Sequence, residues 1–209
     1  MADEGHIDPD RIRGPGTQDF DASYETGTPP WDIGRPQSAF VALLDSGEIR
    51  GGVLDVGCGT GEHVLMAAAK GLEATGVDAA PTAIRLAREK AALRSLDARF
   101  SVWDALDLPA LGNQFDTVLD CGLFHVFDDD ERGRFAASLS SVVVPGGRYF
   151  MLCFSDKQPG DWGPRRVSQE ELCDCFTGGW RVDSIRDTVI EITLSPDGAQ
   201  AWLAEFTRL

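Results

Sequence analysis

Two spacings of apolar residues alternate along the chain. Short, largely apolar runs predict strands at 52–56, 73–78, 98–104, 115–122 and 146–155. Segments whose apolar residues recur three or four positions apart predict helices at 35–49, 62–71, 81–96 and 129–143. Strands and helices that alternate in this way build a mostly parallel sheet with helices on both faces.

The C-terminal part has a different pattern. Ser168 and Glu171 form the signature of a capping box, which predicts a helix at 168–176. Two strand-like runs follow at 180–194 and 199–209, separated by the turn sequence SPDG. They predict an antiparallel hairpin at the end of the sheet. The expected fold class is therefore α/β, with three layers and a seven-stranded, mostly parallel sheet.

The N-terminal segment, residues 1–34, is rich in Gly, Pro and Asp. We predict a flexible tail at 1–19 and a single domain at 20–209. In that domain, 20–50 holds an aromatic segment and the first helix, 51–155 the core, and 156–209 a substrate-side loop, a helix and the hairpin. Three aromatic residues in a polar context either form a lid over a binding site or only anchor the N-terminus, namely Phe20, Tyr24 and Trp31.

The net charge of the chain indicates which kind of ligand the protein binds. The 209 residues carry a formal net charge of −15, with an isoelectric point near 4.5. This charge repels a phosphate backbone and an anionic membrane, so we expect a small-molecule ligand rather than nucleic acid or a membrane. No run approaches the roughly 20 apolar residues of a membrane span. We expect a monomer or a homodimer.

The five cysteines indicate a reducing compartment. Their number is odd, and most lie inside apolar strand-like runs, which is typical of free thiols in the cytoplasm. Cys173 and Cys175 are too close in sequence for a standard metal pair, and no second pair accompanies them. We therefore expect a cytoplasmic protein without a metal site.

Candidate binding residues follow the predicted strands, and ligands of open α/β sheets bind at those ends. The first strand runs into VLDVGCGTGEH, where Gly57, Gly59 and Gly61 either bare the backbone for a ligand or only make a tight turn. Asp78 ends the second strand, where a carboxylate can accept from two ribose hydroxyls or cap the next helix. Asp104 follows the third strand and can accept from an adenine amino group, although Asp is also a routine turn residue.

The spacing of the glycines distinguishes between nucleotide ligands. The dinucleotide fingerprint is G-x-G-x-x-G, whereas this chain has G-x-G-x-G followed by Glu62. A carboxylate at that helix start would repel a pyrophosphate. We therefore expect a ligand without phosphates, which disfavours a nicotinamide-dependent oxidoreductase.

These motifs resemble those of the Rossmann-like, class I S-adenosylmethionine-dependent methyltransferases. VLDVGCGTGEH is similar to their glycine-rich motif, GVDAAPTAI to their ribose-binding motif and WDALDL to their adenine-contacting motif. The resemblance implies S-adenosylmethionine as cofactor and S-adenosylhomocysteine as product. It places the following residues at the cofactor: Asp55, Gly57, Cys58, Gly59, Gly61, Asp78, Ala79, Asp104, Ala105, Asp120 and Cys121.

A second resemblance concerns the N-terminal segment. FDASYETGTPPWDIGRPQ is similar to the segment that precedes the core in the thiopurine, thiol and halide methyltransferases. It implies that Phe20, Tyr24 and Trp31 close over the cofactor, where that group carries tryptophans. Phe20 and Tyr24 depart from that pattern.

The expected activity is methylation of a small molecule, with a thiol as first candidate. Methyl transfer mainly needs a positioned nucleophile and exclusion of water. His125 follows the fourth strand and is the candidate base, and Tyr24 could contact the acceptor. Arg165 and Arg166 could select an anionic substrate. The alternatives are N- or O-methylation of an aromatic or heteroaromatic metabolite and, more remotely, binding of the cofactor without catalysis.

Overall fold

The computed structural model describes residues 20–209, and the tail predicted at 1–19 lies outside the described residues. Its helices are α1 (Phe20–Thr26), α2 (Ser38–Asp45), α3 (Glu62–Ala69), α4 (Pro81–Arg94), the 3-10 helices η2 (Ala105–Leu111) and η3 (Phe124–Val126), α5 (Asp129–Val142) and α6 (Gln169–Cys175). Its strands are β1 (Val53–Val56), β2 (Ala74–Asp78), β3 (Arg99–Val102), β4 (Phe115–Cys121), β5 (Val143–Phe154), β6 (Trp180–Ile192) and β7 (Ser195–Arg208).

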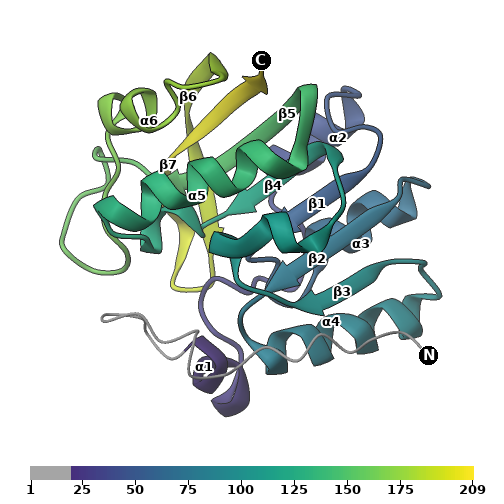
Figure 1. Cartoon of the computed structure of the whole chain (residues 1–209). Helices are drawn as coiled ribbons and strands as arrows, with labels where there is room; N and C mark the ends of the chain where they lie inside the picture. The colour runs from purple at the N-terminus through teal and green to yellow at the C-terminus, as the bar shows by residue number, and fades with distance from the viewer. Residues whose placement is uncertain (1–19) are drawn as a thin grey trace.

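The seven strands form one sheet in the order β3-β2-β1-β4-β5-β7-β6 (Figure 1). The pairs from β3 to β5 are parallel, and β7 is antiparallel to both β5 and β6. The predicted fold class, a mostly parallel seven-stranded sheet with an antiparallel C-terminal hairpin, is confirmed. The chain moves outward from β1 to β3 and then returns to place β4 on the other side of β1. The carboxyl ends of β1 and β4 therefore flank the point where the strand order reverses, at which such folds bind ligands.

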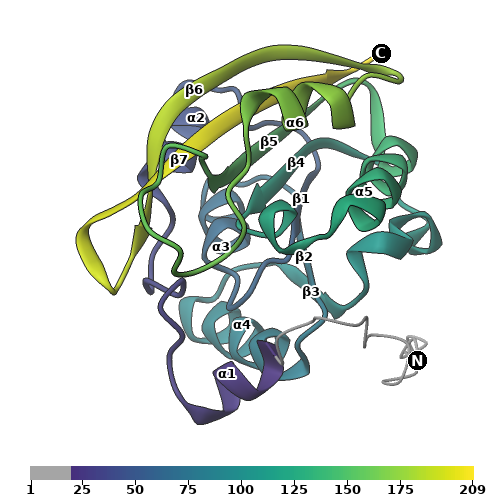
Figure 2. The same ribbon diagram turned by 90° about the vertical axis from the view of Figure 1, so that its left-hand side faces the viewer.

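Helices cover both faces of the sheet (Figure 2). One buried cluster joins α2, α3 and α4 to the sheet and includes Phe40, Leu65 and Ile84. The other joins η2, α5 and α6 to the opposite face and includes Phe135 and Leu172. The short apolar strands are buried on both faces for this reason. Helices α3, α4 and α5 start at the predicted residues, whereas α2 starts at Ser38, three residues after the predicted start. None of the helices among residues 20–209 is long and apolar enough to cross a membrane.

The hairpin turn lies three residues before the predicted one. Ile192 pairs with Ser195, so the chain reverses at Thr193 and Leu194, and the SPDG sequence belongs to β7. Gly198 has a φ of +68°, close to a register shift between Ile190 and Ile192. Gly198 therefore allows the register shift between β6 and β7 and does not form the tip of the hairpin.

Besides η3, two short helices were not predicted from the sequence. The aromatic segment forms α1, one face of which packs on α4. The connection between β3 and β4, expected to be a loop, contains η2, whose first turn is capped by the Asp104 carboxylate on the Leu106 N–H at 2.8 Å. Both are too short to show a clear apolar period.

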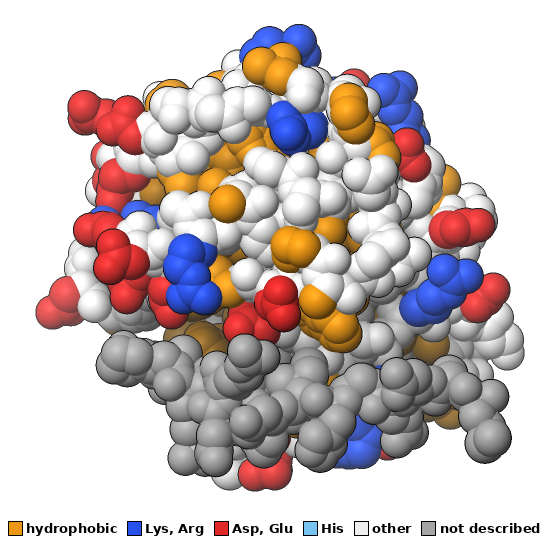
Figure 3. Space-filling model, viewed as in Figure 1, with side chains coloured by type: hydrophobic (Ala, Val, Ile, Leu, Met, Phe, Trp, Pro, Cys, Tyr) orange, Lys and Arg blue, Asp and Glu red, His pale blue; other side chains and the backbone are white. Residues whose placement is uncertain are grey.

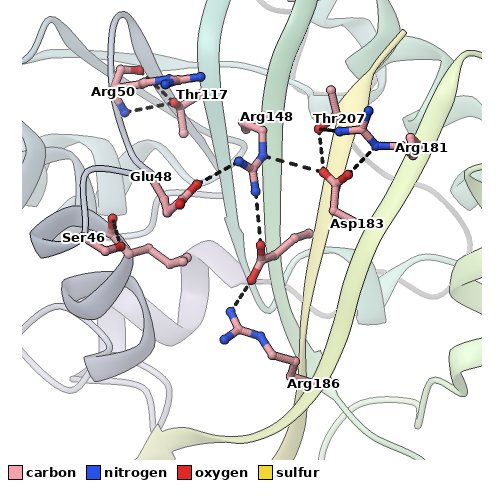
Figure 4. Close-up of polar contacts among 11 residues, drawn as sticks. Ser46, Glu48, Arg50, Thr117, Arg148, Arg181, Asp183, Arg186 and Thr207 are labelled. Carbon is pink, nitrogen blue, oxygen red and sulfur yellow. Dashed lines mark hydrogen bonds and ion pairs between the residues drawn. The ribbon is translucent and has the colours of Figure 1, made fainter.

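An arginine-centred network fastens the hairpin to the parallel part of the sheet (Figure 4). Arg148 of β5 lies 2.8 Å from a Glu48 oxygen, 3.1 Å from a Glu205 oxygen and 3.8 Å from an Asp183 oxygen. Arg186 pairs with the other oxygen of Glu205. Because the Arg148 side chain is only 18% exposed, water screens its positive charge poorly, and these three carboxylates compensate that charge. A hollow of about 630 Å³ adjoins the network between α2 and the hairpin.

We expect Arg148→Ala to lower the free energy of unfolding by about 2–4 kcal/mol, because it leaves half-buried carboxylates without their cation. Arg186→Ala is the matched control. Its side chain is 56% exposed, so the loss should be at most about 1 kcal/mol. Urea denaturation of both variants measures the difference. Equal losses would mean that the Arg148 network carries no special stability.

Candidate active site

A cavity of about 1560 Å³ lies at the carboxyl ends of the parallel strands. Its lining comes from the loops after β1, β2, β3 and β4, from α1 and the segment before α2, and from the loop after β5 and the hairpin tip. In the space-filling view, apolar side chains show in the middle of the face, and both acidic and basic side chains lie around its edge (Figure 3). Thirteen of the predicted site residues line this cavity: Phe20, Tyr24, Trp31, Gly57, Cys58, Gly59, Gly61, Asp78, Ala79, Asp104, Ala105, Cys121 and His125. Asp55 and Asp120 do not line it.

The three glycines of the loop serve different purposes. All have positive φ, at +67°, +51° and +86° for Gly57, Gly59 and Gly61. A Cβ on Gly59 would lie 2.8 Å from the Tyr24 hydroxyl, and one on Gly61 would lie 2.6 Å from the Phe100 ring. Gly61 therefore allows α3 to pack closely against β3, whereas Gly59 leaves room for α1. Gly57, Gly59 and Gly61 all line the cavity.

Asp78 links the glycine loop to the start of α4. Its two carboxylate oxygens accept from the Gly59 N–H at 2.7 Å and the Ala80 N–H at 2.8 Å. Each oxygen keeps further acceptor capacity, and the residue lines the cavity. Burial raises the pKa of Asp78 to about 6, against the lowering effect of the two N–H groups. The position that caps α4 is occupied by Ala80, so Asp78 is not the N-cap residue of that helix.

Asp55, in the middle of β1, is a buried carboxylate whose hydrogen bonds are unmet. Neither of its oxygens has a hydrogen-bond partner among residues 20–209. The nearest cation candidate is His63, whose Nδ1 lies 3.5 Å from an Asp55 oxygen. His63 Nε2 accepts from the Gln37 N–H at 3.2 Å, so the ring proton is on Nδ1 and faces Asp55. A buried carboxylate in this state has spare capacity for a donor.

Asp120 has a structural role that differs from the predicted one. Its oxygens accept from the Leu123 N–H and the Tyr149 hydroxyl, both at 2.8 Å, and from the Phe124 N–H at 3.2 Å. Burial raises the pKa of Asp120 to about 7, although these three donors oppose the shift. Because all its bonds go to the protein, Asp120 fixes the turn that carries His125 rather than facing a ligand.

His125 lines the cavity, but its hydrogen bond does not fit the predicted role of base. Its Nδ1 accepts from the Phe154 N–H at 3.1 Å, so the ring proton lies on Nε2. Burial lowers the pKa of His125 to about 3, with Arg132 and Arg166 lowering it further. A neutral ring with Nε2–H donates a hydrogen bond near neutral pH and is a poor proton acceptor.

The N-terminal aromatic residues cover the glycine loop. The Tyr24 hydroxyl accepts from the Trp31 Nε1–H at 2.9 Å, and the Trp31 ring lies edge-on to Phe20 with centroids 5.8 Å apart. Burial raises the pKa of Tyr24, so its hydroxyl stays protonated. Asp21 and Asp32 dock this segment by accepting from the Thr82 N–H and the Thr60 hydroxyl, both at 2.7 Å. The aromatic residues therefore lie where a lid was predicted.

The charge argument based on Glu62 was wrong. Lys90 and Arg94 each pair with Glu62 at 2.8 Å, so its charge is neutralised within α3 and α4. Burial alone would raise the pKa of Glu62, but Arg94 and Lys90 hold it below its usual value. Glu62 consequently cannot serve as a barrier against phosphate.

Of the two arginines predicted to select an anionic substrate, Arg165 lines the cavity and Arg166 does not, and both already have partners. Arg165 pairs with Asp129 and Glu171, and Arg166 donates to main-chain carbonyls of its own loop. Sequence reasoning also missed the apolar residues across the cavity from the glycine loop, which are Phe154, Trp162, Ile190, Ile192 and Leu194. One sequence feature could have indicated these residues: Leu194 is an apolar residue directly before the predicted hairpin turn, and it is 70% exposed in the structure.

Comparison with known proteins identifies the family. The family model described as methyltransferase domain matches residues 53–147. The chain is 36% identical over 176 residues to the 2-heptyl-1-hydroxyquinolin-4(1H)-one methyltransferase of Mycobacteroides abscessus, and the match covers 79% of this chain and 78% of the relative. It is 27% identical over 160 residues to the probable thiol methyltransferase 2 of Arabidopsis thaliana, across 73% of this chain and 68% of the relative.

Solved structures agree with this assignment. One, described as "Conversion of a Disulfide Bond into a Thioacetal Group during Echinomycin Biosynthesis", has a TM-score of 0.81 and 39% identity, and the match covers 90% of this chain and 91% of that one. The magnesium protoporphyrin IX methyltransferase of Synechocystis with bound S-adenosylmethionine shares the fold, with a TM-score of 0.65 and 21% identity over 95% of this chain and 88% of that one.

The chain therefore belongs to the class I S-adenosylmethionine-dependent methyltransferases. It is a small-molecule methyltransferase, and its cofactor is S-adenosylmethionine. The cavity fits that group, because bare glycine backbone and the Asp78 carboxylate, which keeps free acceptor capacity, line it.

The protonation of His125 can be measured directly. We expect its ring to remain the neutral Nε2–H tautomer from pH 5 to pH 8, because the pKa is lowered to about 3. Long-range ¹⁵N–¹H spectra of the imidazole groups report tautomer and charge, and His125→Gln assigns the signals among the three histidines. A His125 signal that titrates in this range would contradict the assignment.

Proposed function

We propose that this enzyme methylates an oxygen on an apolar, hydroxylated heteroaromatic acceptor. The observation that carries the proposal is the acceptor side of the cavity, where the neutral His125 ring lies 5.2 Å from the Phe154 ring, and where Trp162 and Ile190 also line the cavity. Such walls favour a flat, apolar ring, and an Nε2–H donor favours a polar atom on that ring that accepts a hydrogen bond. The more similar of the two named curated relatives acts, by its name, on a hydroxyquinolone.

A thiol acceptor is the second candidate. It was the first candidate from the N-terminal motif, and two findings support it: the Arabidopsis relative is named a thiol methyltransferase, and the 39% identical structure is described by the conversion of a disulfide into a thioacetal. Both acceptor classes share the property that the site requires. A thiol or an acidic heteroaromatic hydroxyl ionises near neutral pH without a strong protein base.

The cofactor side is assigned to main-chain groups and two carboxylates. We place the ribose at the free lone pairs of Asp78 and the adenine beside Asp104 and Ala105, which line the same side of the cavity. Asp104 already accepts from the Leu106 N–H, so one oxygen remains the better acceptor for the adenine amino group.

The chain contributes position and shielding rather than proton transfer. The cofactor, when bound, supplies an electrophilic methyl group on a sulfonium. His125 Nε2–H orients the acceptor and stabilises its anionic form by a hydrogen bond. Tyr24 and Trp31 cover the glycine loop and exclude water from the reacting atoms. Asp120 holds the His125 turn in place through its three bonds to the protein.

The role of Asp78 is testable by cofactor binding. We expect Asp78→Asn to raise the Kd of S-adenosylhomocysteine roughly 10- to 100-fold, because it removes charge-assisted hydrogen bonds to the ribose. The affinity of the wild type should be constant above pH 7 and fall as the pH drops below about 6, where the free Asp78 carboxylate gains a proton. Asp78→Asn should show no such dependence. Isothermal titration calorimetry from pH 5 to 8 measures both effects.

Asp45→Asn provides the control for this experiment, since its side chain is 59% exposed and pairs with Lys70 on the surface. Its affinity should equal that of the wild type. Wild-type affinity in Asp78→Asn would place the ribose elsewhere.

The acceptor class is tested with three probes: 2-heptyl-1-hydroxyquinolin-4(1H)-one, 4-nitrothiophenol and 1-octanethiol. Methylation of the quinolone with the highest kcat/KM is the expected result. His125→Ala should lower its kcat/KM about 10- to 100-fold, as for loss of a hydrogen bond to a developing or full charge. The pH profile should follow ionisation of the acceptor, because His125 does not titrate there. Preference for either thiol would favour the second candidate.

A further inference from the structure

The loop between β5 and α6, residues 156–166, forms part of the acceptor side and is called the wall loop below. It contains no helix or strand, and its ends are joined where Val167 donates to the Phe154 carbonyl at 3.1 Å and Asp156 donates to the Val167 carbonyl at 3.0 Å. Trp162 lies within it and lines the cavity, with 39% of the residue exposed. An exposed tryptophan on a loop keeps one position only if something holds the loop.

Arg166 supplies that hold from the end of the loop. Its guanidinium donates to the carbonyl oxygens of Gln158 at 3.2 Å, Gly160 at 3.2 Å, Trp162 at 2.9 Å and Pro164 at 2.6 Å. None of these partners is a carboxylate. One planar group with five donors thus fixes four points of the wall loop, which a lysine cannot do.

The same guanidinium contacts the aromatic rings of the acceptor side. Its central carbon lies 5.2 Å from the centre of the Phe154 ring and 5.6 Å from that of the Trp162 ring. Trp162 is edge-on to Phe154 at 5.7 Å, and Phe154 is edge-on to His125 at 5.2 Å. Arg166 is therefore the common contact of both outer rings in a row that runs from the surface to the acceptor donor.

The backbone of the wall loop fits this arrangement closely. Gly160 and Gly163 have φ values of +78° and +76°, which place the chain around the guanidinium. A Cβ on Gly160 would lie 3.2 Å from the Trp162 ring, and one on Gly163 would lie 3.4 Å from the Phe154 ring. A side chain at Gly160 would therefore press on the Trp162 ring, whereas one at Gly163 would make an ordinary contact with the Phe154 ring and would be disfavoured by its positive φ.

We propose that Arg166 is a positioning residue for acceptor specificity: it holds Trp162 and Phe154 as an aromatic wall that selects flat-ring acceptors over flexible aliphatic ones. The proposal rests on the proposed function, because it assigns the acceptor to this side of the cavity. Arg166 acts through the wall loop and touches neither the cofactor side nor the reacting atoms. Its loss therefore weakens ring acceptors selectively and leaves cofactor binding intact.

The test uses the full-length enzyme with Arg166→Met, Arg166→Lys and Trp162→Ala, and with Arg85→Met as control, since Arg85 is 59% exposed and pairs with Glu89 on α4. We expect Arg166→Met and Trp162→Ala to raise the KM of the quinolone and of 4-nitrothiophenol at least tenfold, with kcat and the Kd of S-adenosylhomocysteine within twofold of wild type. Arg166→Lys should lie between, because it keeps the charge over the rings but loses bonds to the carbonyls. The double variant Arg166→Met/Trp162→Ala should be no worse than either single one.

Four outcomes decide the matter. An unchanged KM for ring acceptors in Arg166→Met would contradict the proposed role of Arg166. An equal rise in the KM for 1-octanethiol would also contradict it. A parallel loss of S-adenosylhomocysteine affinity also overturns it, because it indicates general damage. Calorimetric binding of the quinolone to the S-adenosylhomocysteine complex separates the two proposals: binding that Arg166→Met weakens, without turnover, supports the wall and contradicts only the proposed reaction.

Discussion

The two hydrogen bonds that Asp78 accepts are the interaction on which the site depends. They join the carboxyl end of β2 to the loop after β1 at Gly59 and to the start of α4. Because Gly59 lacks a side chain, the Tyr24 hydroxyl rests directly on the same loop, and α1 is held above it. One partly neutral carboxylate thus sets the distance between two strand ends and the height of the lid. Movement of Asp78 would displace all three.

The sequence was a good guide wherever the controlling forces are local. Glycine at positive φ, the capping box of Ser168 and Glu171, and the strand end at Asp78 each depend on a few neighbouring residues. The errors come from partners distant in sequence. Glu62 is neutralised by residues 28 and 32 positions away, and the tautomer of His125 is set by an N–H 29 positions away. A local sequence pattern cannot predict these contacts, because the tertiary fold brings the partners together. The acceptor wall was missed for the same reason.

Hydrogen bonds and an ion pair join the segment after α1 to the hairpin tip. The Gln37 side chain donates to the Glu191 carbonyl at 2.9 Å and accepts from the Glu191 N–H at 2.8 Å. Arg35 adds a bidentate pair with the Glu191 carboxylate, and the Thr193 N–H donates to the Pro30 carbonyl at 2.9 Å. The segment that follows the cofactor lid is therefore bound to the strand that carries Ile190 and Ile192 on the acceptor side. The first and last parts of the described chain close the same cavity.

The two sides of the cavity differ in what they are made of. The side to which we assign the cofactor consists of backbone and buried carboxylates whose replacement disturbs the strands, whereas the side to which we assign the acceptor presents exposed side chains such as Trp162 and Leu194, at 39% and 70%. A substitution among the latter leaves no void in the core and costs little stability. The scaffold can therefore change its chemistry by single mutations at the rim while its cofactor requirement stays fixed. A change of acceptor specificity therefore costs little folding stability in such an architecture, whereas a change of the cofactor site costs more.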